Sequence, residues 1–350
     1  MLHYFFNYCN IYAVNNYIDS EVPHMTSKFT KQNLDILELY KYQSKIERLD
    51  GFLNQQLWLS SLAEFKDPFE GAFILKSDPS KLKPGTAIFD HHYNYFKKNI
   101  NLTLTQEQLI DFLKSQEFIK ASNENETLIK DLFSNHGVFC FTYSNTNIPM
   151  WAHYANDHQG YCVNFEINFL DIYKLLPGYS VEDARKYKDS VLDGRNLLSF
   201  HTTMNEEIKF VLTKVRYLST APEIYLDKFL ELKDEYQAVC YIIQNSMGTK
   251  FDQWAYENEF RLIVNANSLT SGSQLVDLKI YAPFLTATGV IMGAKMSAED
   301  KTKCRDLCRK YNVKLYQAEC SDYKYEITVD LVKDYSIVNN RLDTQLVEIT

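Results

Sequence analysis

The sequence predicts an α+β fold, in which a mixed, split β-sheet is interrupted by helical insertions. Segments with the alternation typical of strands are separated by helical segments of unequal length. No regular strand–helix–strand rhythm of a doubly wound sheet runs along the chain. Of the 350 residues, 45% are hydrophobic and 14% aromatic, which is enough for a large core. We therefore expect one α+β domain over residues 31–335, between an N-terminal extension (1–30) and a C-terminal tail (336–350).

Local signals in the first half of the chain place helix starts and stops among the strands. Thr105, followed by Gln-Glu-Gln, fits an N-cap and a good first turn. Pro149 suits the beginning of a helix, and Gly160 suits its end. The expected elements are a strand ending at Gln43, a short helix or turn over 44–54, a strand over 57–60, a loop over 62–71, a helical insertion over about 78–135, a strand over 137–144, a helix over 149–155 and a strand over 161–167.

The second half is expected to continue with a second helical insertion and then a series of strands. This insertion covers about 169–250, with one strand at 214–217 and its clearest helix over 227–247. Ser297 caps a later helix that ends at Tyr311, with acidic residues in its first turn. The remaining strands are expected over 253–264, 274–280, 287–293, 313–317 and 325–329.

Composition excludes several classes of protein. The net charge of -8 argues against the broad basic surface that duplex DNA demands and leaves room only for a local basic groove. The seven cysteines contain no Cys-x-x-Cys pair, which favours reduced thiols over a disulfide framework or a zinc site. No apolar run approaches the ~20 residues of a membrane span. We therefore expect a cytoplasmic protein with no metal and no membrane partner.

The most informative charge pattern lies in Gln-Trp-Ala-Tyr-Glu-Asn-Glu-Phe-Arg-Leu-Ile-Val, residues 253–264. In a strand, side chains alternate between the two faces, so Glu257, Glu259 and Arg261 would share one face. Two carboxylates and a guanidinium are costly to bury unless they pair with one another or serve a ligand. The row is therefore either a structural salt-bridge ladder or a catalytic Glu-x-Glu strand.

Four blocks of the sequence resemble a bacterial family known chiefly as a domain of unknown function. The family hallmarks read roughly Tyr-Lys-Tyr, Asn-Asp-Pro-Phe-Glu, Met-Trp-x-His-Tyr-Ala and Tyr-Glu-x-Glu-x-Arg. The resemblance runs from about Leu39 to Gly293, and Lys66 stands where the family usually has Asn. The matching blocks are Leu39-Tyr-Lys-Tyr42, Phe65-Lys-Asp-Pro-Phe-Glu70, Met150-Trp-Ala-His-Tyr-Ala155 and Trp254-Ala-Tyr-Glu-Asn-Glu-Phe-Arg261.

A more distant resemblance is to the ADP-ribosyltransferases, which share the order of these parts. They carry an early strand residue that anchors NAD, then a strand ending in Ser or Tyr that leads into a helix, then a late Glu-x-Glu strand. The first block here has a lysine where those enzymes use Arg or His. The resemblance implies a split β-sheet core of their type. The counterparts are Tyr40-Lys41-Tyr42, Tyr143-Ser144 and Glu257-x-Glu259.

The resemblance implies an enzyme that uses NAD to modify a macromolecule. Cleavage of the nicotinamide–ribose bond passes through an oxocarbenium-like centre, which a nearby carboxylate stabilises. We expect Glu259 in this role and Glu257 as a general base for the acceptor. The NAD site would contain Tyr42 or Tyr143 stacked on nicotinamide, Lys41 at the pyrophosphate, Ser144 supporting Glu259, and Tyr40.

The resemblance also implies partners and a setting. The acceptor would be RNA, DNA or protein, and the enzyme would act as a bacterial toxin or an antiphage (antiviral) defence effector. A toxin of this kind implies a neutralising antitoxin, as in a toxin–antitoxin pair. The aromatic segment 1–23 is one candidate contact for it.

Two alternatives stay open. The first is a non-enzymatic binding module of a defence system, in which the Glu row is a structural ion-pair ladder. The second is a metal-dependent nuclease that uses Asp67, Glu70 and histidines, although an Asx-type turn at Asp67 and a basic partner for Glu70 are favoured. The discriminating feature is spatial. In the transferase, Tyr42, Ser144 and Glu259 converge on one open cleft, whereas in the binding module Arg261 and a lysine saturate both glutamates and no cleft exists.

Overall fold

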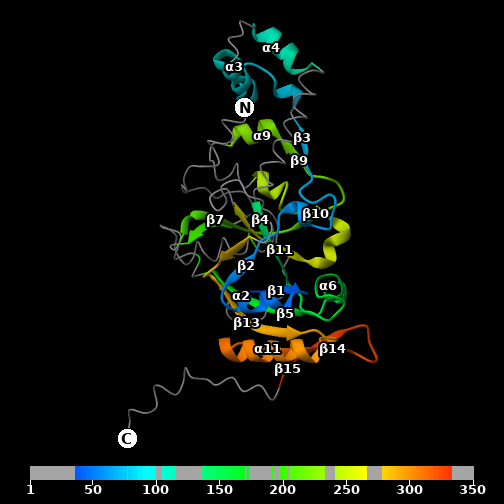
Figure 1. Cartoon of the computed structure of the whole chain (residues 1–350). Helices are drawn as coiled ribbons and strands as arrows, with labels where there is room; N and C mark the ends of the chain where they lie inside the picture. The colour runs from blue at the N-terminus through cyan, green and yellow to red at the C-terminus, as the bar shows by residue number, and fades with distance from the viewer. Residues whose placement is uncertain are drawn as a thin grey trace. The chain divides into compact units, whose positions relative to one another are not determined.

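A computed structural model describes most of the chain and divides it into two compact units (Figure 1). The first unit takes the described residues within 62–135 and 216–252, and the second takes those within 36–61, 136–215 and 253–332. The expected N-terminal extension and C-terminal tail lie outside the described residues. The described residues are 36–76, 78–99, 105–115, 136–169, 172, 191, 198–202, 205–232, 241–265 and 278–332.

The second unit is built on a nine-stranded mixed sheet in the order β15-β14-β13-β5-β1-β4-β11-β7-β6. β13 and β14 run parallel, and the other neighbours pair antiparallel. The mixed α+β class expected from the sequence is therefore present. The strands are β1 (Ile36–Gln43), β4 (His136–Thr142), β5 (Tyr161–Asn168), β6 (Leu198–Thr202), β7 (Asn205–Lys214), β11 (Glu259–Asn265), β13 (Leu285–Met292), β14 (Lys314–Cys320) and β15 (Ile327–Leu331).

One face of this sheet carries the main hydrophobic core. Alternate apolar residues of its central strands, such as Leu39, Phe139, Phe165 and Leu262, point into this core. Helices α2 (Leu49–Leu53) and α11 (Ala298–Tyr311) contribute buried side chains to it, as does the short pair β2 (Gln56–Trp58) and β12 (Lys279–Tyr281). Two cysteines of α11, Cys304 and Cys308, are both buried there.

The opposite face has a smaller core under helix α6 (Ile148–Tyr154). Trp151 is fully buried in it and packs edge-to-face on Tyr42, with ring centroids 5.0 Å apart. Asn147 caps α6 through Oδ1, which accepts a hydrogen bond from the Met150 amide at 3.1 Å. Trp151 is therefore a core residue that anchors α6 on the sheet.

The sheet opens between β1 and β4. These two strands pair at Tyr40 and Thr142, whereas at Val138 the partner of β4 is Ser60. Gly137 permits the close approach, because a Cβ there would lie 2.6–2.7 Å from side-chain atoms of Leu59. The segment after β2 therefore fills the gap on one side of the Tyr40–Thr142 pair.

The first unit has shorter elements. A small apolar cluster joins α3 to α4, and the N-cap predicted at Thr105 is present at the beginning of α4 as part of a capping box. The strands pair in parallel, β3 with β9 and β8 with β10. Its elements are η2 (Leu62–Glu64), β3 (Ile74–Lys76), η3 (Pro79–Lys81), α3 (Ala87–Asn99), α4 (Gln106–Leu113), β8 (Arg216–Leu218), β9 (Glu223–Tyr225), α9 (Leu226–Glu231) and β10 (Thr249–Phe251).

Within the expected helical insertion 169–250, the sequence analysis was wrong about 198–225. We expected helices with one strand at 214–217, but the structure has strands β6 to β9 between Leu198 and Tyr225. The physical reason is that β7 pairs with β11, which lets Phe210 and Leu212 reach the main core. The helix expected over 227–247 is seen as α9 and again over 241–244, and residues 233–240 lie outside the described residues. Ser297 caps α11 as predicted.

The close approach at Gly137 generates a stability prediction. Gly137→Ala places a methyl group against Leu59, so overpacking should lower the free energy of unfolding by about 1–3 kcal/mol in a urea titration. Leu59→Ala alone should also destabilise the protein. The double variant should lose less free energy of unfolding than the sum of the losses in the two single variants, because the truncated side chain at position 59 makes room for the new methyl group. Strict additivity would contradict the proposed contact.

Candidate functional site

The three blocks that resemble ADP-ribosyltransferase parts lie on, or directly beside the ends of, the adjacent strands β1, β4 and β11 (Figure 1). Thr142 of β4 lies directly opposite Tyr40 of β1 on one side and Glu259 of β11 on the other. Directly opposed residues of antiparallel strands project from the same face. Tyr40, Thr142 and Glu259 therefore form one row across the sheet, and Tyr42 shares their face because it is two residues from Tyr40.

Glu259 is held by Arg261 from the next position on the same face of β11. Arg261 Nε donates to Oε1 of Glu259 at 2.7 Å, and Nη2 donates to Oε2 at 3.3 Å. The exposed fractions of the two residues are 0% for Arg261 and 3% for Glu259. A permanent cation in a charge-assisted fork stabilises the ionised carboxylate, which would be costly to bury alone. Arg261 therefore fixes the position of the Glu259 carboxylate.

Burial and the Glu259 carboxylate affect the pKa values of both Cys140 and Lys41. Cys140 lies opposite Arg261 in the sheet, and the pKa of its thiol is raised by burial and then by the Glu259 carboxylate. The pKa of Lys41 is lowered by burial, which outweighs the opposing effects of Cys140 and Glu259. The Lys41 ammonium lies 4.6 Å from the centroid of the Phe139 ring. Lys41 is therefore near the Glu259 carboxylate but reaches toward the main-core side of the sheet.

Glu257 does not lie in the strand, which corrects the expectation of a continuous Glu-x-Glu-x-Arg row. It ends the 3₁₀ helix η4 (Asp252–Glu257), and Asn258, with φ of 44°, turns the chain into β11. Asparagine tolerates this left-handed conformation better than most residues. Glu257 is nevertheless buried, with 2% of its surface exposed. The Tyr154 hydroxyl donates to its Oε1 at 2.5 Å.

A hydrogen bond from a side chain to the backbone joins the beginning of helix α6 to η4. The Asn147 side chain, which caps α6, also donates from Nδ2 to the carbonyl oxygen of Tyr256 at 2.6 Å. The Trp151 indole donates to the Asn145 carbonyl at 2.8 Å. The turn between β4 and α6 therefore fixes the position of the residue that precedes Glu257.

Tyr42 and Ser144 meet, but through the main chain. The Tyr42 hydroxyl donates to the carbonyl oxygen of Ser144 at 3.0 Å. The Ser144 hydroxyl instead accepts from the Thr146 amide at 3.3 Å, so its bond lies within its own turn. Burial raises the pKa of Tyr42 well above the usual range and, together with the Glu38 charge, raises that of Tyr40 to about 12.

Tyr143 lies on the other face of the sheet. Its ring packs edge-to-face on Phe260 at 5.7 Å, against the main core, and Lys214 lies over it at 5.5 Å. Successive residues of a strand face opposite sides, so Tyr143 and its neighbour Thr142 are separated by the sheet. Of the two tyrosines considered for stacking on nicotinamide, only Tyr42 shares a face with Glu259.

Tyr154 is a site residue that the sequence reasoning missed. It stands in the Met-Trp-x-His-Tyr-Ala block, and that block was the available signal. Burial raises the pKa of Tyr154, and the charges of Glu257 and then Glu259 raise it further. The phenol therefore keeps its proton and donates it in the hydrogen bond to Glu257.

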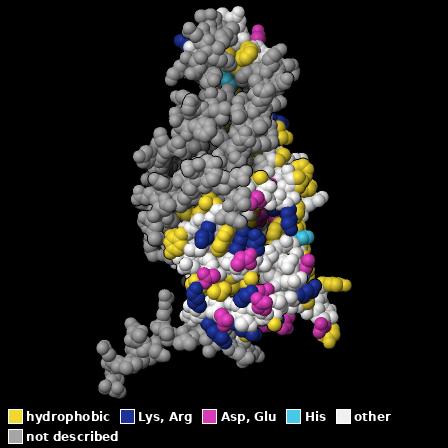
Figure 2. Space-filling view, viewed as in Figure 1, with side chains coloured by type: hydrophobic (Ala, Val, Ile, Leu, Met, Phe, Trp, Pro, Cys, Tyr) yellow, Lys and Arg dark blue, Asp and Glu magenta, His cyan; other side chains and the backbone are white. Residues whose placement is uncertain are grey.

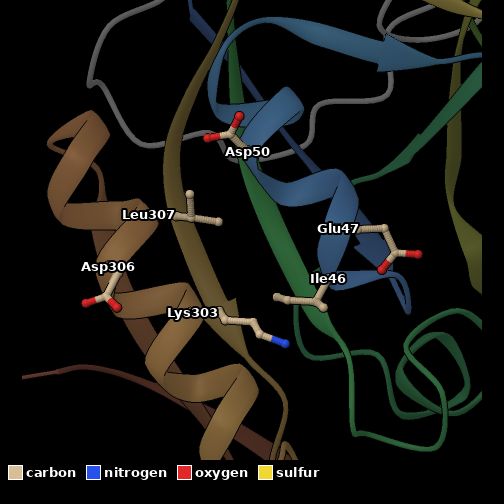
Figure 3. A pocket seen from close by; sticks show the side chains of 6 residues that line it. All are labelled: Ile46, Glu47, Asp50, Lys303, Asp306 and Leu307. Atoms are coloured by element: carbon tan, nitrogen blue, oxygen red, sulfur yellow. The ribbon is translucent and has the colours of Figure 1, made fainter.

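A pocket of about 430 Å³ lies elsewhere in the second unit, between α11 and the segment of η1 (Ile46–Arg48) and α2 (Figure 3). Its polar side chains are engaged locally: Asp50 accepts hydrogen bonds from Lys310 at 2.8 Å and from Tyr311 at 3.0 Å. None of the predicted site residues lines it. The lining residues are Ile46, Glu47, Asp50, Lys303, Asp306 and Leu307.

The residues considered for a nuclease behave as structural residues of the first unit. Asp67 Oδ1 accepts a hydrogen bond from the Phe69 amide at 2.9 Å, which is the predicted Asx-type turn. Lys250 Nζ lies 3.7 Å from Glu70, which is the predicted basic partner. Among the described residues, no group of three or more His, Cys, Asp or Glu side chains is placed to hold a metal ion.

Charges of both signs cover the described surface of the second unit on the face in Figure 2, where Lys and Arg side chains lie among Asp and Glu. This face offers no uniform basic field of the kind that favours binding along duplex DNA. Within the described part of the chain, no helix is long and apolar enough to cross a membrane.

The buried ion pair generates a prediction. Arg261→Met leaves the Glu259 carboxylate buried without its fork, so the free energy of unfolding should fall by about 3–5 kcal/mol at neutral pH. Without the guanidinium the folded-state pKa of Glu259 should rise above its unfolded value, so the variant should regain stability as the pH falls. Urea titrations at acidic and alkaline pH measure both effects.

Two controls accompany this variant. Adding Glu259→Gln should recover part of the loss, because no charge is then buried. Arg309→Met, on the exposed surface beside Asp306, should change stability by less than about 1 kcal/mol. An Arg261→Met variant as stable as the wild type would contradict the role given to the pair.

Comparison with known proteins adds one match. No curated protein and no solved structure matches the chain. Residues 150–262, about a third of the chain, match the model of a family described as a protein of unknown function (DUF2971). This segment begins in α6 and ends in β11, so it contains Tyr154, Glu257, Glu259 and Arg261. The match supports the resemblance to a family of unknown function.

Proposed function

We propose that this chain is an ADP-ribosyltransferase-like enzyme that transfers ADP-ribose from NAD to a macromolecule. The observation that carries the proposal is the row of Tyr40, Thr142 and Glu259 across three adjacent strands. The resemblance requires an NAD-anchoring strand, a strand leading into a helix and a late glutamate strand to act at one place. These three segments are far apart in the sequence and neighbours in the sheet.

The chemistry assigns a role to each carboxylate. The bond between C1′ of the ribose and the nicotinamide nitrogen breaks, and its electron pair leaves with nicotinamide. Glu259, kept ionised by Arg261, would stabilise the positive charge that develops on the ribose. Glu257 would accept a proton from the acceptor nucleophile as that nucleophile forms its bond to C1′. The two steps would use the carboxylates of Glu259 and Glu257, which are two residues apart in the chain.

The NAD-binding residues divide by face. Tyr40 and Tyr42 share the face of Glu259 and supply aromatic surface beside it, whereas Lys41 points to the opposite face, over Phe139, and is not placed to meet the pyrophosphate of an NAD bound beside Glu259. Since 2–3% of Glu257 and Glu259 is exposed, NAD reaches them only if side chains of α6 or η4 move aside. A gating motion of this kind is common in enzymes that exclude water from reactive intermediates.

A second candidate function has its own supporting observation. Arg261 and Tyr154 each satisfy one carboxylate in a buried setting, which is also what a purely structural ladder requires. In a binding module, these residues would only stabilise the fold. The expectations of a toxin or defence role, a neutralising partner and a particular acceptor class stay predictions.

Transfer of label from NAD tests the proposal. Wild-type protein is incubated with NAD labelled in the adenylate portion, together with total cell RNA, DNA or protein. Label should appear on one acceptor class, and Glu259→Gln should reduce its rate by about 10²–10³-fold, because the ribosyl cation loses its counter-charge. Glu319→Gln, an exposed glutamate on β14, is the matched control and should retain full activity.

The outcome separates the two candidate functions. Folded wild-type protein that neither transfers label nor releases nicotinamide, with all three acceptor classes present, would contradict the enzyme and favour the binding module. Equal transfer by wild type and Glu259→Gln would remove Glu259 from the chemistry.

A further inference from the structure

Tyr154 is the residue of this site that the proposed function has not used. It is the last residue of α6, and its hydroxyl reaches Glu257 at the end of η4 over 2.5 Å. The two residues are 103 positions apart in the sequence. The bond therefore joins two separate elements at the carboxylate that would act as the base.

The geometry of this bond is fixed from both ends of α6. At the beginning of the helix, Asn147 donates to the carbonyl of Tyr256, the residue before Glu257, at 2.6 Å. At the end, Tyr154 binds the Glu257 side chain itself. Trp151, fully buried between them, anchors the helix on Tyr42. Main chain and side chain of the 256–257 segment are thus both held by α6, and the carboxylate has a defined orientation.

The direction of the bond is also defined. Burial and the two nearby carboxylates keep the proton on Tyr154, so the phenol is a donor and not an acceptor. A donor to a carboxylate favours its ionised form over its protonated form. Tyr154 should therefore lower the pKa of the Glu257 carboxyl group, so that Glu257 is ionised before the reaction and can accept the proton of the nucleophile.

We infer that Tyr154 is a positioning residue for Glu257, orienting this carboxylate and keeping it ionised until the acceptor delivers its proton. The inference rests on the proposed function. In the transfer step the nucleophile forms its bond to C1′ and releases a proton to Glu257, and the electron pair of the C1′–nitrogen bond leaves with nicotinamide. Tyr154 keeps its own proton throughout.

The pH profile of Tyr154→Phe tests the inference. Without the phenol hydroxyl, Glu257 should take up a proton at higher pH, so the acidic limb of the transfer rate should move up by about one to two pH units. Replacement of Tyr154 by 3-fluorotyrosine, a stronger donor of the same shape, should move the limb downward. Tyr161→Phe removes another buried phenol hydroxyl, bonded to the Lys45 carbonyl at 3.1 Å, and should leave the limb in place.

A second readout does not depend on activity. Carbon-13 NMR follows the titration of the Glu257 carboxyl, assigned by its loss in Glu257→Gln, and its midpoint should rise in Tyr154→Phe. An unmoved midpoint, or an active Tyr154→Phe with an unmoved acidic limb, would overturn the inference alone. If wild-type protein transfers no label, the proposed function fails, and the positioning role of Tyr154 in the transfer reaction fails with it. The titration then still decides whether Tyr154 controls the ionisation of Glu257.

Discussion

The buried pair of Arg261 and Glu259 is the interaction on which the centre of the sheet depends. The charged side chains of Glu259 and Arg261 are 3% and 0% exposed, and on β11 they lie opposite Thr142 and Cys140 of β4. Removing either partner would leave an uncompensated charge in a low-dielectric setting, whereas an apolar replacement of both would cost little. Retention of the pair therefore carries no stability argument of its own, and a functional use of the carboxylate gives it a physical reason.

The surrounding elements can be understood as support for this pair. The gap between β1 and β4 narrows to one residue pair, Tyr40 and Thr142, beside Glu259. Helix α6 covers the same face and brings a neutral donor, Tyr154, to the second carboxylate. One glutamate thus has a permanent cation in direct contact and the other a phenol. Environments that differ in this way are how enzymes give different tasks to two carboxylates.

Local signals in the sequence predicted much of the fold. Alternation located β1, β4, β5 and β13, and the cap at Ser297 located α11, because both signals come from neighbours in the chain. Long-range pairing was not readable in this way: 205–214 is a strand because it lies against β11. That Tyr40, Tyr42 and Glu259 share one face also follows from long-range strand pairing, and the left-handed turn at Asn258 and the contact of Tyr154 likewise depend on tertiary structure.

The most direct test of the central claim asks where NAD binds. Hydrogen–deuterium exchange of the wild-type chain is measured with and without an uncleavable carba-analogue of NAD, which removes any dependence on turnover or acceptor. The account predicts slower exchange in the segments around Tyr40–Tyr42, Thr142–Asn147 and Tyr256–Arg261, with no change along α11 beside the pocket in Figure 3. Slower exchange confined to α11, or no slowing of exchange in any segment at a saturating concentration of the analogue, would contradict the account.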